Sequence, residues 1–157
     1  MKTLWHLCWL ALPALTAPLG AQQDPSLPKK ELIRPPNYRP SPAPLSPALL
    51  VGNTLYLSGA TGGDPATGQL VAGGFEPEFR QLMSNLKAVL ASANLDFSDV
   101  VAVTAYLVDI NDYQRFNQLY REYFTTEPLP TRSTVAVKDL ARGAHVELTM
   151  TAVRTRR

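Results

Sequence analysis

Few side chains in this sequence could do chemistry, and the first arrangement to test is a serine–histidine pair. His145 could in principle partner Ser58 or Ser133, and such a pair would activate a serine nucleophile. Ser58, however, has Tyr56 and Ala60 where a nucleophile elbow has glycines. A lone histidine is also more often a surface or packed residue, so the pattern does not favour this chemistry.

Other familiar ligand sites are excluded by composition or spacing. One cysteine and two histidines cannot build a cysteine-rich or a three-histidine zinc site. The glycines at positions 59, 62 and 63 are not followed by the Lys-Ser or Lys-Thr of a phosphate-binding loop. Asp109, Asn111 and Asp112 lack the glycine and the final glutamate of a calcium loop, and they fit better as helix caps. We therefore expect no metal site.

Arg132 and Glu147 are the two remaining candidates. Arg132 follows residues 128–131 at the mouth of a predicted strand, and Glu147 lies on the half-polar face of the last predicted strand. In isolation, an arginine at a strand start and a glutamate within a strand are most often solvated charges. From their residue types alone, Arg132 and Glu147 could therefore be surface charges without a role in chemistry.

Hydrophobic periodicity predicts the elements that position these residues. Residues 49–51 and 54–58 are two predicted strands around a Gly-Asn turn, the usual signal of a β-hairpin, and a turn-rich loop follows over 59–68. Residues 76–93 carry an apolar stripe at helical spacing and predict a helix. Residues 100–108 are β-branched and almost continuously apolar, which predicts a strand buried on both faces.

The second half of the sequence continues the alternation of helix and strand. A second helix is predicted to begin at Asn111, with Gln114 completing a capping box, and to stop before Pro128. Two strands follow, over residues 133–137 and 145–153. In the last strand apolar and polar residues alternate, so one face is apolar and the other carries Thr and Glu side chains.

This order of elements predicts an α+β sandwich in which one mixed sheet carries both helices on one face. The opposite face bears the Thr and Glu side chains of residues 145–153, so it must be solvated or buried against another subunit. A half-polar sheet face in a small, aromatic-rich domain favours a homo-oligomer.

Three parts are distinguished along the 157 residues. Residues 1–21 combine a positive start, an apolar run and small residues before a cleavage point near Ala21, which predicts a signal peptide and a periplasmic or secreted protein. Prolines interrupt the apolar run, so stable membrane insertion is not expected; an uncleaved N-terminal anchor is the alternative. Residues 22–47 contain eight prolines and predict an extended arm or linker, with at most a short strand at 31–33.

Residues 48–157 are long enough for one domain. The formal net charge of the chain is +2, which gives no electrostatic footprint for a nucleic-acid partner. The single cysteine excludes an internal disulfide. An exported protein of this kind must be stabilised by packing or by oligomerisation.

Several motifs occur in the order typical of a known family. The segments 51–59 (VGNTLYLSG), 130–135 (PTRSTV) and 146–148 (VEL), together with the helical segments 80–90 and 116–124, resemble the Rid family of RidA/YjgF-like reactive-intermediate deaminases. The resemblance covers roughly residues 45–157. It implies a chorismate-mutase-like α+β fold that forms a homotrimer, with sites in the clefts between subunits.

The resemblance also implies an activity. Members of this family hydrolyse reactive 2-imino acids to 2-oxo acids and ammonia without a cofactor. Arg132 matches the carboxylate-binding arginine, whose planar guanidinium can hold a carboxylate at two points. Glu147 matches the acidic residue that positions the attacking water and accepts its proton. Ser58 and Gly59 match the loop that lines the pocket, and Asn117 matches a position that supports the site.

Several positions depart from the family pattern, among them Pro47, which follows Ser46 where the family has a Ser-Gln step. Thr134 stands where many members have Cys, Leu45 where many have Tyr, and Ala60 where many have Gln. The apolar residues at 45 and 60 predict a drier pocket that prefers larger side chains or a different ligand. One alternative is therefore a non-catalytic module that binds a carboxylate or another small molecule. Another is an interaction or chaperone-like protein of the cell envelope that docks through the arm of residues 22–47.

Overall fold

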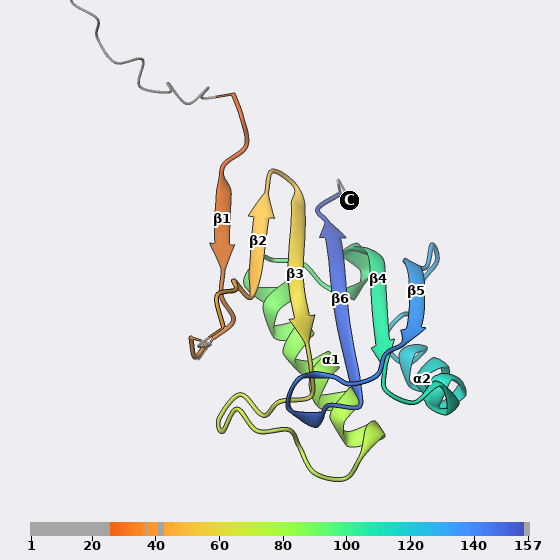
Figure 1. Cartoon of the computed structure of the whole chain (residues 1–157). Coiled ribbons are helices and arrows are strands. Elements are labelled where there is room, and N and C mark those ends of the chain that lie inside the picture. Colours follow the sequence, from red (N-terminus) through yellow and green to blue (C-terminus); the bar gives the residue numbers. More distant parts are fainter. Residues whose placement is uncertain (1–25, 37, 41–42, 156–157) are drawn as a thin grey trace, which may run out of the picture.

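The computed structural model describes residues 26–36, 38–40 and 43–155, and the described residues contain one sheet of six strands and two α-helices (Figure 1). The strands follow the spatial order β1-β2-β3-β6-β4-β5. The predicted signal peptide, residues 1–21, lies outside the described residues. The helices are α1 (Phe75–Ser92) and α2 (Tyr113–Tyr120), and the strands are β1 (Lys30–Ile33), β2 (Ala48–Val51), β3 (Thr54–Ala60), β4 (Val100–Leu107), β5 (Thr131–Ala136) and β6 (Val146–Val153).

The sheet is mixed, as the sequence predicts. Its pairings are antiparallel except that of β4 with β5, which is parallel. The β2–β3 hairpin turns at Gly52, whose φ of 59° is accessible to glycine at no steric cost. The parallel pairing follows from α2, because a strand that re-enters a sheet in the same direction needs a crossover element.

The core lies between one face of the sheet and the two helices. Helix α1 runs across β3 and β6, and α2 lies near the end of β4 and β5 (Figure 1). Strand β6 alternates as predicted, with its apolar residues buried and Glu147, Thr149 and Thr151 half-buried on the other face. The apolar stripe of α1 and the aromatic residues of α2 complete one cluster, which includes Phe79, Leu82, Leu86, Leu90, Phe116, Leu119 and Tyr120.

Strand β4 differs from its prediction. It was expected to be buried on both faces, but Val101 is 43% exposed and Ala102, Thr104 and Tyr106 are half-buried. Both helices pack on the same side of the sheet, so a single chain covers only the other set of β4 side chains. Within one chain, this apolar strand is therefore buried on one face only, and its other face is accessible to solvent.

The region predicted as an extended arm contains a strand of the sheet. Strand β1 includes the short strand foreseen at residues 31–33 and pairs with β2, with Leu32 opposite Leu49. Ile33 is buried in the core. At least this part of the arm is therefore an edge strand that packs on the domain.

The second helix is also shorter and differently capped than predicted. A 3₁₀ turn over Ile110–Asp112 precedes α2, and the Asp109 side chain caps this turn by accepting the N–H of Asn111. Helix α2 itself begins at Tyr113 without a side-chain cap, so the expected capping box at Asn111 is wrong. The helix ends at Tyr120, and Phe124, in the turn that follows, remains buried against the core.

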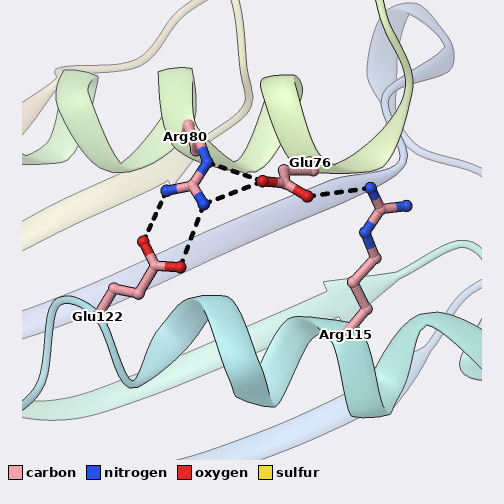
Figure 2. Close-up of polar contacts among 4 residues, drawn as sticks. All are labelled: Glu76, Arg80, Arg115 and Glu122. Atoms are coloured by element: carbon pink, nitrogen blue, oxygen red, sulfur yellow. Dashed lines mark hydrogen bonds and ion pairs between the residues drawn. The ribbon is translucent and has the colours of Figure 1, made fainter.

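A network of ion pairs joins the two helices on the outside of the protein. Figure 2 shows Arg80 of α1 between Glu76 and Glu122, with Arg115 of α2 on the other side of Glu76. Hydrogen bonds from Arg115 and Arg80 lower the pKa of Glu76, and those from Arg80 lower the pKa of Glu122. Beneath the network, the rings of Phe79 and Phe116 pack edge to face at 5.6 Å, an arrangement that fixes α2 against α1.

Candidate active site

Arg132 lies at an edge of the sheet, on β5, and its side chain points to the helix side. In the β4–β5 register it is opposite Val103, which is buried in the core. The guanidinium carbon lies 4.6 Å from the centre of the Tyr120 ring and 4.8 Å from that of Phe116. Burial raises the pKa of Tyr120 to about 12, and the positive charge of Arg132 opposes this rise.

Asn117 fixes the guanidinium in its own plane. The Nη2 of Arg132 donates to the Oδ1 of Asn117 at 2.6 Å, from one turn of α2. Aromatic rings therefore pack around the guanidinium, and an amide oxygen accepts a hydrogen bond from one of its N–H groups. Since a guanidinium carries five N–H donors, others remain for a ligand. An arginine oriented in this way is suited to binding a planar anion such as a carboxylate.

Two hollows flank Arg132. The larger, of about 840 Å³, extends along α2 to the segment that leads into β5, and the smaller, of about 510 Å³, lies between Ile110, Tyr113 and Thr134. The Oγ1 of Thr134 is buried and finds no hydrogen-bond partner among the described residues. A buried hydroxyl without a partner is costly unless a water or ligand satisfies it. Thr134 and Arg132 thus both line the smaller hollow.

Glu147 lies on the opposite, open face of the sheet. It is opposite Tyr106 in the β4–β6 register, between the buried residues Val146 and Leu148. Its carboxylate packs directly against Gly59 of β3, at the point where the β3–β6 register shifts. A Cβ atom at position 59 would lie 2.9 Å from the carboxyl carbon of Glu147, so only glycine leaves room for this side chain.

Ser58 ties the start of the domain to this part of β3. Its Oγ donates to the carbonyl oxygen of Ser46 at 2.6 Å, and its N–H donates to that of Pro47 at 3.0 Å. Leu45, which directly precedes Ser46, is 52% exposed. Ala60 ends β3 and, with Gly59, lines a hollow of about 340 Å³ whose walls also include Pro36 and Tyr38. One part of the structure therefore contains Ser58, Gly59 and Glu147, and Leu45 adjoins it next to Ser46.

The sequence-predicted site residues thus form two groups within one chain. Arg132, Asn117 and Thr134 lie together at the β5 edge, and Glu147, Gly59 and Ser58 lie together on the other face. Strand β4 separates β5 from β6. Arg132 and Glu147 therefore do not face each other inside a single chain.

The serine–histidine pairings considered for this sequence are not formed. The Nδ1 of His145 lies 2.8 Å from Oε2 of Glu78, and the hydroxyl of Ser58 is bonded to Ser46. Sequence reasoning missed Glu78, a residue of the first turn of α1 with 1% exposure. The available signal was its position within the apolar stripe, three residues after Phe75 and four before Leu82.

Two features of the described residues bear on other functions. They contain no group of three or more His, Cys, Asp or Glu side chains arranged to hold a metal ion. Within the same residues, neither helix has the length and apolar content needed to cross a membrane.

Comparison with known proteins identifies the family. The family model described as Endoribonuclease L-PSP matches residues 37–154. The chain belongs to this family. Among solved structures, a Rid family protein of Yersinia pestis superposes with a TM-score of 0.76 at 34% identity, over 80% of this chain and all of that one. The Rid resemblance and the α+β fold inferred from the sequence motifs are both confirmed.

Several relatives of this Rid family member are named for an activity or a family. This chain is 40% identical over 110 residues to the human 2-iminobutanoate/2-iminopropanoate deaminase, and the alignment covers 70% of this chain and 80% of the relative. It is 46% identical over 112 residues to Protein DfrA of Myxococcus xanthus, over 70% of this chain and 85% of the relative. RidA of a Psychrobacter species superposes with a TM-score of 0.74 at 31% identity, over 79% of this chain and 99% of that one.

Proposed function

We propose that this protein hydrolyses 2-imino acids to 2-oxo acids and ammonia, as an imine deaminase of the 2-iminobutanoate/2-iminopropanoate type. The observation that carries the proposal is the orientation of Arg132, stacked on Tyr120 and Phe116 and bonded to Asn117 beside a hollow. Such a guanidinium suits the carboxylate that every 2-imino acid carries. The name of the human relative supports the same reaction.

The proposed site is completed by a second copy of the chain, in a homotrimer. Two observations support this arrangement. Arg132 and Glu147 belong to opposite faces of the sheet, so a cleft that uses both needs two chains. The open face also exposes apolar side chains, with Tyr56 53% and Val101 43% exposed, and contact with another subunit would cover such residues.

In the proposed reaction the substrate carboxylate binds Arg132, and the C=N carbon is directed toward Glu147 of a neighbouring copy. Glu147 holds a water molecule and accepts its proton as the oxygen adds to C2, giving a carbinolamine. Proton transfer to the nitrogen then allows ammonia to leave as the C=O bond forms. One water is consumed and one ammonia is released for each 2-oxo acid. The C=N group is already an electrophile, so the scheme needs no cofactor.

The substrate side chain is proposed to be larger and more apolar than in many family members. Leu45 directly precedes Ser46, the residue bonded to Ser58, and Ala60 directly follows Gly59; the family pattern has polar residues at both positions. A pocket wall of this kind gains free energy from burying aliphatic or aromatic substrate atoms.

The test is ammonia release from imines formed in place by an amino-acid oxidase. The wild-type protein should accelerate release above the uncatalysed rate, and Arg132→Ala should abolish the acceleration while the protein remains folded. Absence of acceleration by the wild type would overturn the proposal. In that case, saturable stabilisation by 2-oxobutanoate in a thermal-shift assay would identify a binding module instead.

Export is a separate proposal, which rests on the composition of residues 1–21 alone. A tagged full-length chain should be found in the periplasm or medium, shortened by about that segment. A chain without residues 1–21 is the matched control and should remain in the cytoplasm. Equal distribution of the two would contradict the proposal.

A further inference from the structure

Glu78 is a buried carboxylate that the proposed reaction does not use. It lies in the first turn of α1 and is 1% exposed. Its Oε1 accepts the N–H of His145 at 3.0 Å and that of Val146 at 3.4 Å. Its Oε2 accepts from the Nδ1 of His145 at 2.8 Å and also lies 3.2 Å from the His145 backbone nitrogen. One buried side chain therefore binds the chain at the very start of β6.

The same residue contacts the loop that follows β3. Gly62 is buried against Glu78, and a Cβ atom at position 62 would lie 2.8 Å from the Glu78 carbonyl carbon. The Cγ of Glu78 is also within contact of that position. Because glycine has no side chain, the loop and the first turn of α1 pack directly against each other at position 62.

These contacts flank the close approach of Glu147 to Gly59. Val146, bound by Glu78, directly precedes Glu147, and Gly62, packed on Glu78, is three residues beyond Gly59. The β3–β6 register shifts between Leu57 and Ala60, so the pairing of these two strands does not by itself fix the distance between Gly59 and Glu147. Strand β4 pairs regularly with the start of β6, and Glu78 adds contacts to the start of β6 and to the loop after β3 beside the irregular pairing.

We infer that Glu78 is a positioning residue, which sets the place of the Glu147 carboxylate by anchoring the start of β6 and the loop after β3 to α1. The inference rests on the proposed function for its kinetic consequence, because Glu147 is there the group that orients the water. A base displaced from its water loses rate steeply, while binding of the substrate carboxylate to Arg132 is left intact. The effect of Glu78 therefore falls on kcat and not on KM.

The test compares Glu78→Ala with two closer replacements. Glu78→Ala removes all the acceptors, and kcat for imine hydrolysis should fall by about tenfold or more, with KM within about twofold of wild type. Glu78→Gln keeps an acceptor for the two backbone N–H groups and should retain most of the wild-type kcat. Glu78→Asp keeps the charge but has a shorter side chain, so its carboxylate should not reach all the N–H donors and kcat should fall. This variant takes the place of Glu78→Ala if the alanine variant does not fold.

A control separates positioning from stability. Leu90→Val removes core volume near the C-terminal end of the same helix, about 18 Å along its axis from Glu78, and should lower Tm without changing kcat per folded protein. If Glu78→Ala and Glu78→Asp lower Tm but leave kcat unchanged, the role is only structural and the inference is wrong.

A second measurement does not depend on activity. Crystal structures of wild type and Glu78→Asp should show the Glu147 carboxylate against Gly59 in the first and displaced from it in the second. An unmoved carboxylate would overturn the inference even if the protein proves to be no deaminase. Displacement without any imine hydrolysis by the wild type would uphold the positioning role and reject the proposed function alone.

Discussion

Arg132 and Glu147 extend from opposite faces of the same sheet, from strands β5 and β6 that are separated by β4. The arginine is oriented by α2, and the carboxylate of Glu147 occupies the space that a side chain at Gly59 would fill. Each half of the candidate site is thus preorganised within one chain, and in the proposed homotrimer the two halves meet between copies.

Mixing two inactive variants tests this division of the site. Arg132→Ala and Glu147→Gln should each be inactive alone, but subunits exchanged between them should regain activity. With random mixing at equal amounts, roughly a quarter of the shared sites contain both wild-type residues. Recovery of that size in an imine-hydrolysis assay supports a site between chains, and no recovery after verified subunit exchange would show that each chain supplies both groups.

Arg132→Lys tests whether planarity matters beyond charge. An ammonium keeps the positive charge but loses the two-point fork and the stacking on Tyr120 and Phe116. We expect kcat/KM to fall by about 10- to 100-fold, since a charge-assisted hydrogen bond contributes about 1.5–3 kcal/mol. Steady-state kinetics measure the effect, and a wild-type value in the lysine variant would exclude bidentate binding.

Gly59→Ala tests the close approach of Glu147. The new methyl group occupies the position of the carboxylate, so Glu147 must move and activity should fall by about tenfold or more. In thermal unfolding, Gly59→Ala should be destabilising in the wild type and much less so in a Glu147→Ala background. Additive changes in the free energy of unfolding would mean that the two residues are not coupled.

Acid titration tests the network between the helices. Glu76 and Glu122 have pKa values below the ordinary 4.5, so the unfolded chain binds more protons as the pH falls through this range. Their contribution to stability is therefore present well above pH 4.5 and is lost as the pH falls through the lowered pKa values. The free energy of unfolding, measured by chemical denaturation between about pH 5 and pH 3, should depend less steeply on pH in the double variant Glu76→Gln/Glu122→Gln than in the wild type.

Added salt provides the control for that titration. The network is exposed, so screening by about 1 M salt should reduce the difference between the double variant and the wild type. A pH dependence identical in the two proteins would show that other carboxylates dominate acid unfolding.

The sequence by itself determined the local elements and their chemistry. The alternation along residues 145–153 and the stripe along 76–93 are set by periods of two and 3.6 residues, which one chain segment displays without help from another. The motifs around Arg132 and Glu147 sufficed for the family.

Only the tertiary structure decided which strands are neighbours and which face each residue takes. Periodicity fixes the alternation within a strand, but the side on which Arg132 lies relative to Glu147 depends on registers between segments distant in sequence. Two further contacts are likewise non-local: the pairing of β1 with β2, and the bonds of the buried Glu78 to His145. Such contacts are selected by packing and hydrogen bonding in the folded chain, and no single segment encodes them.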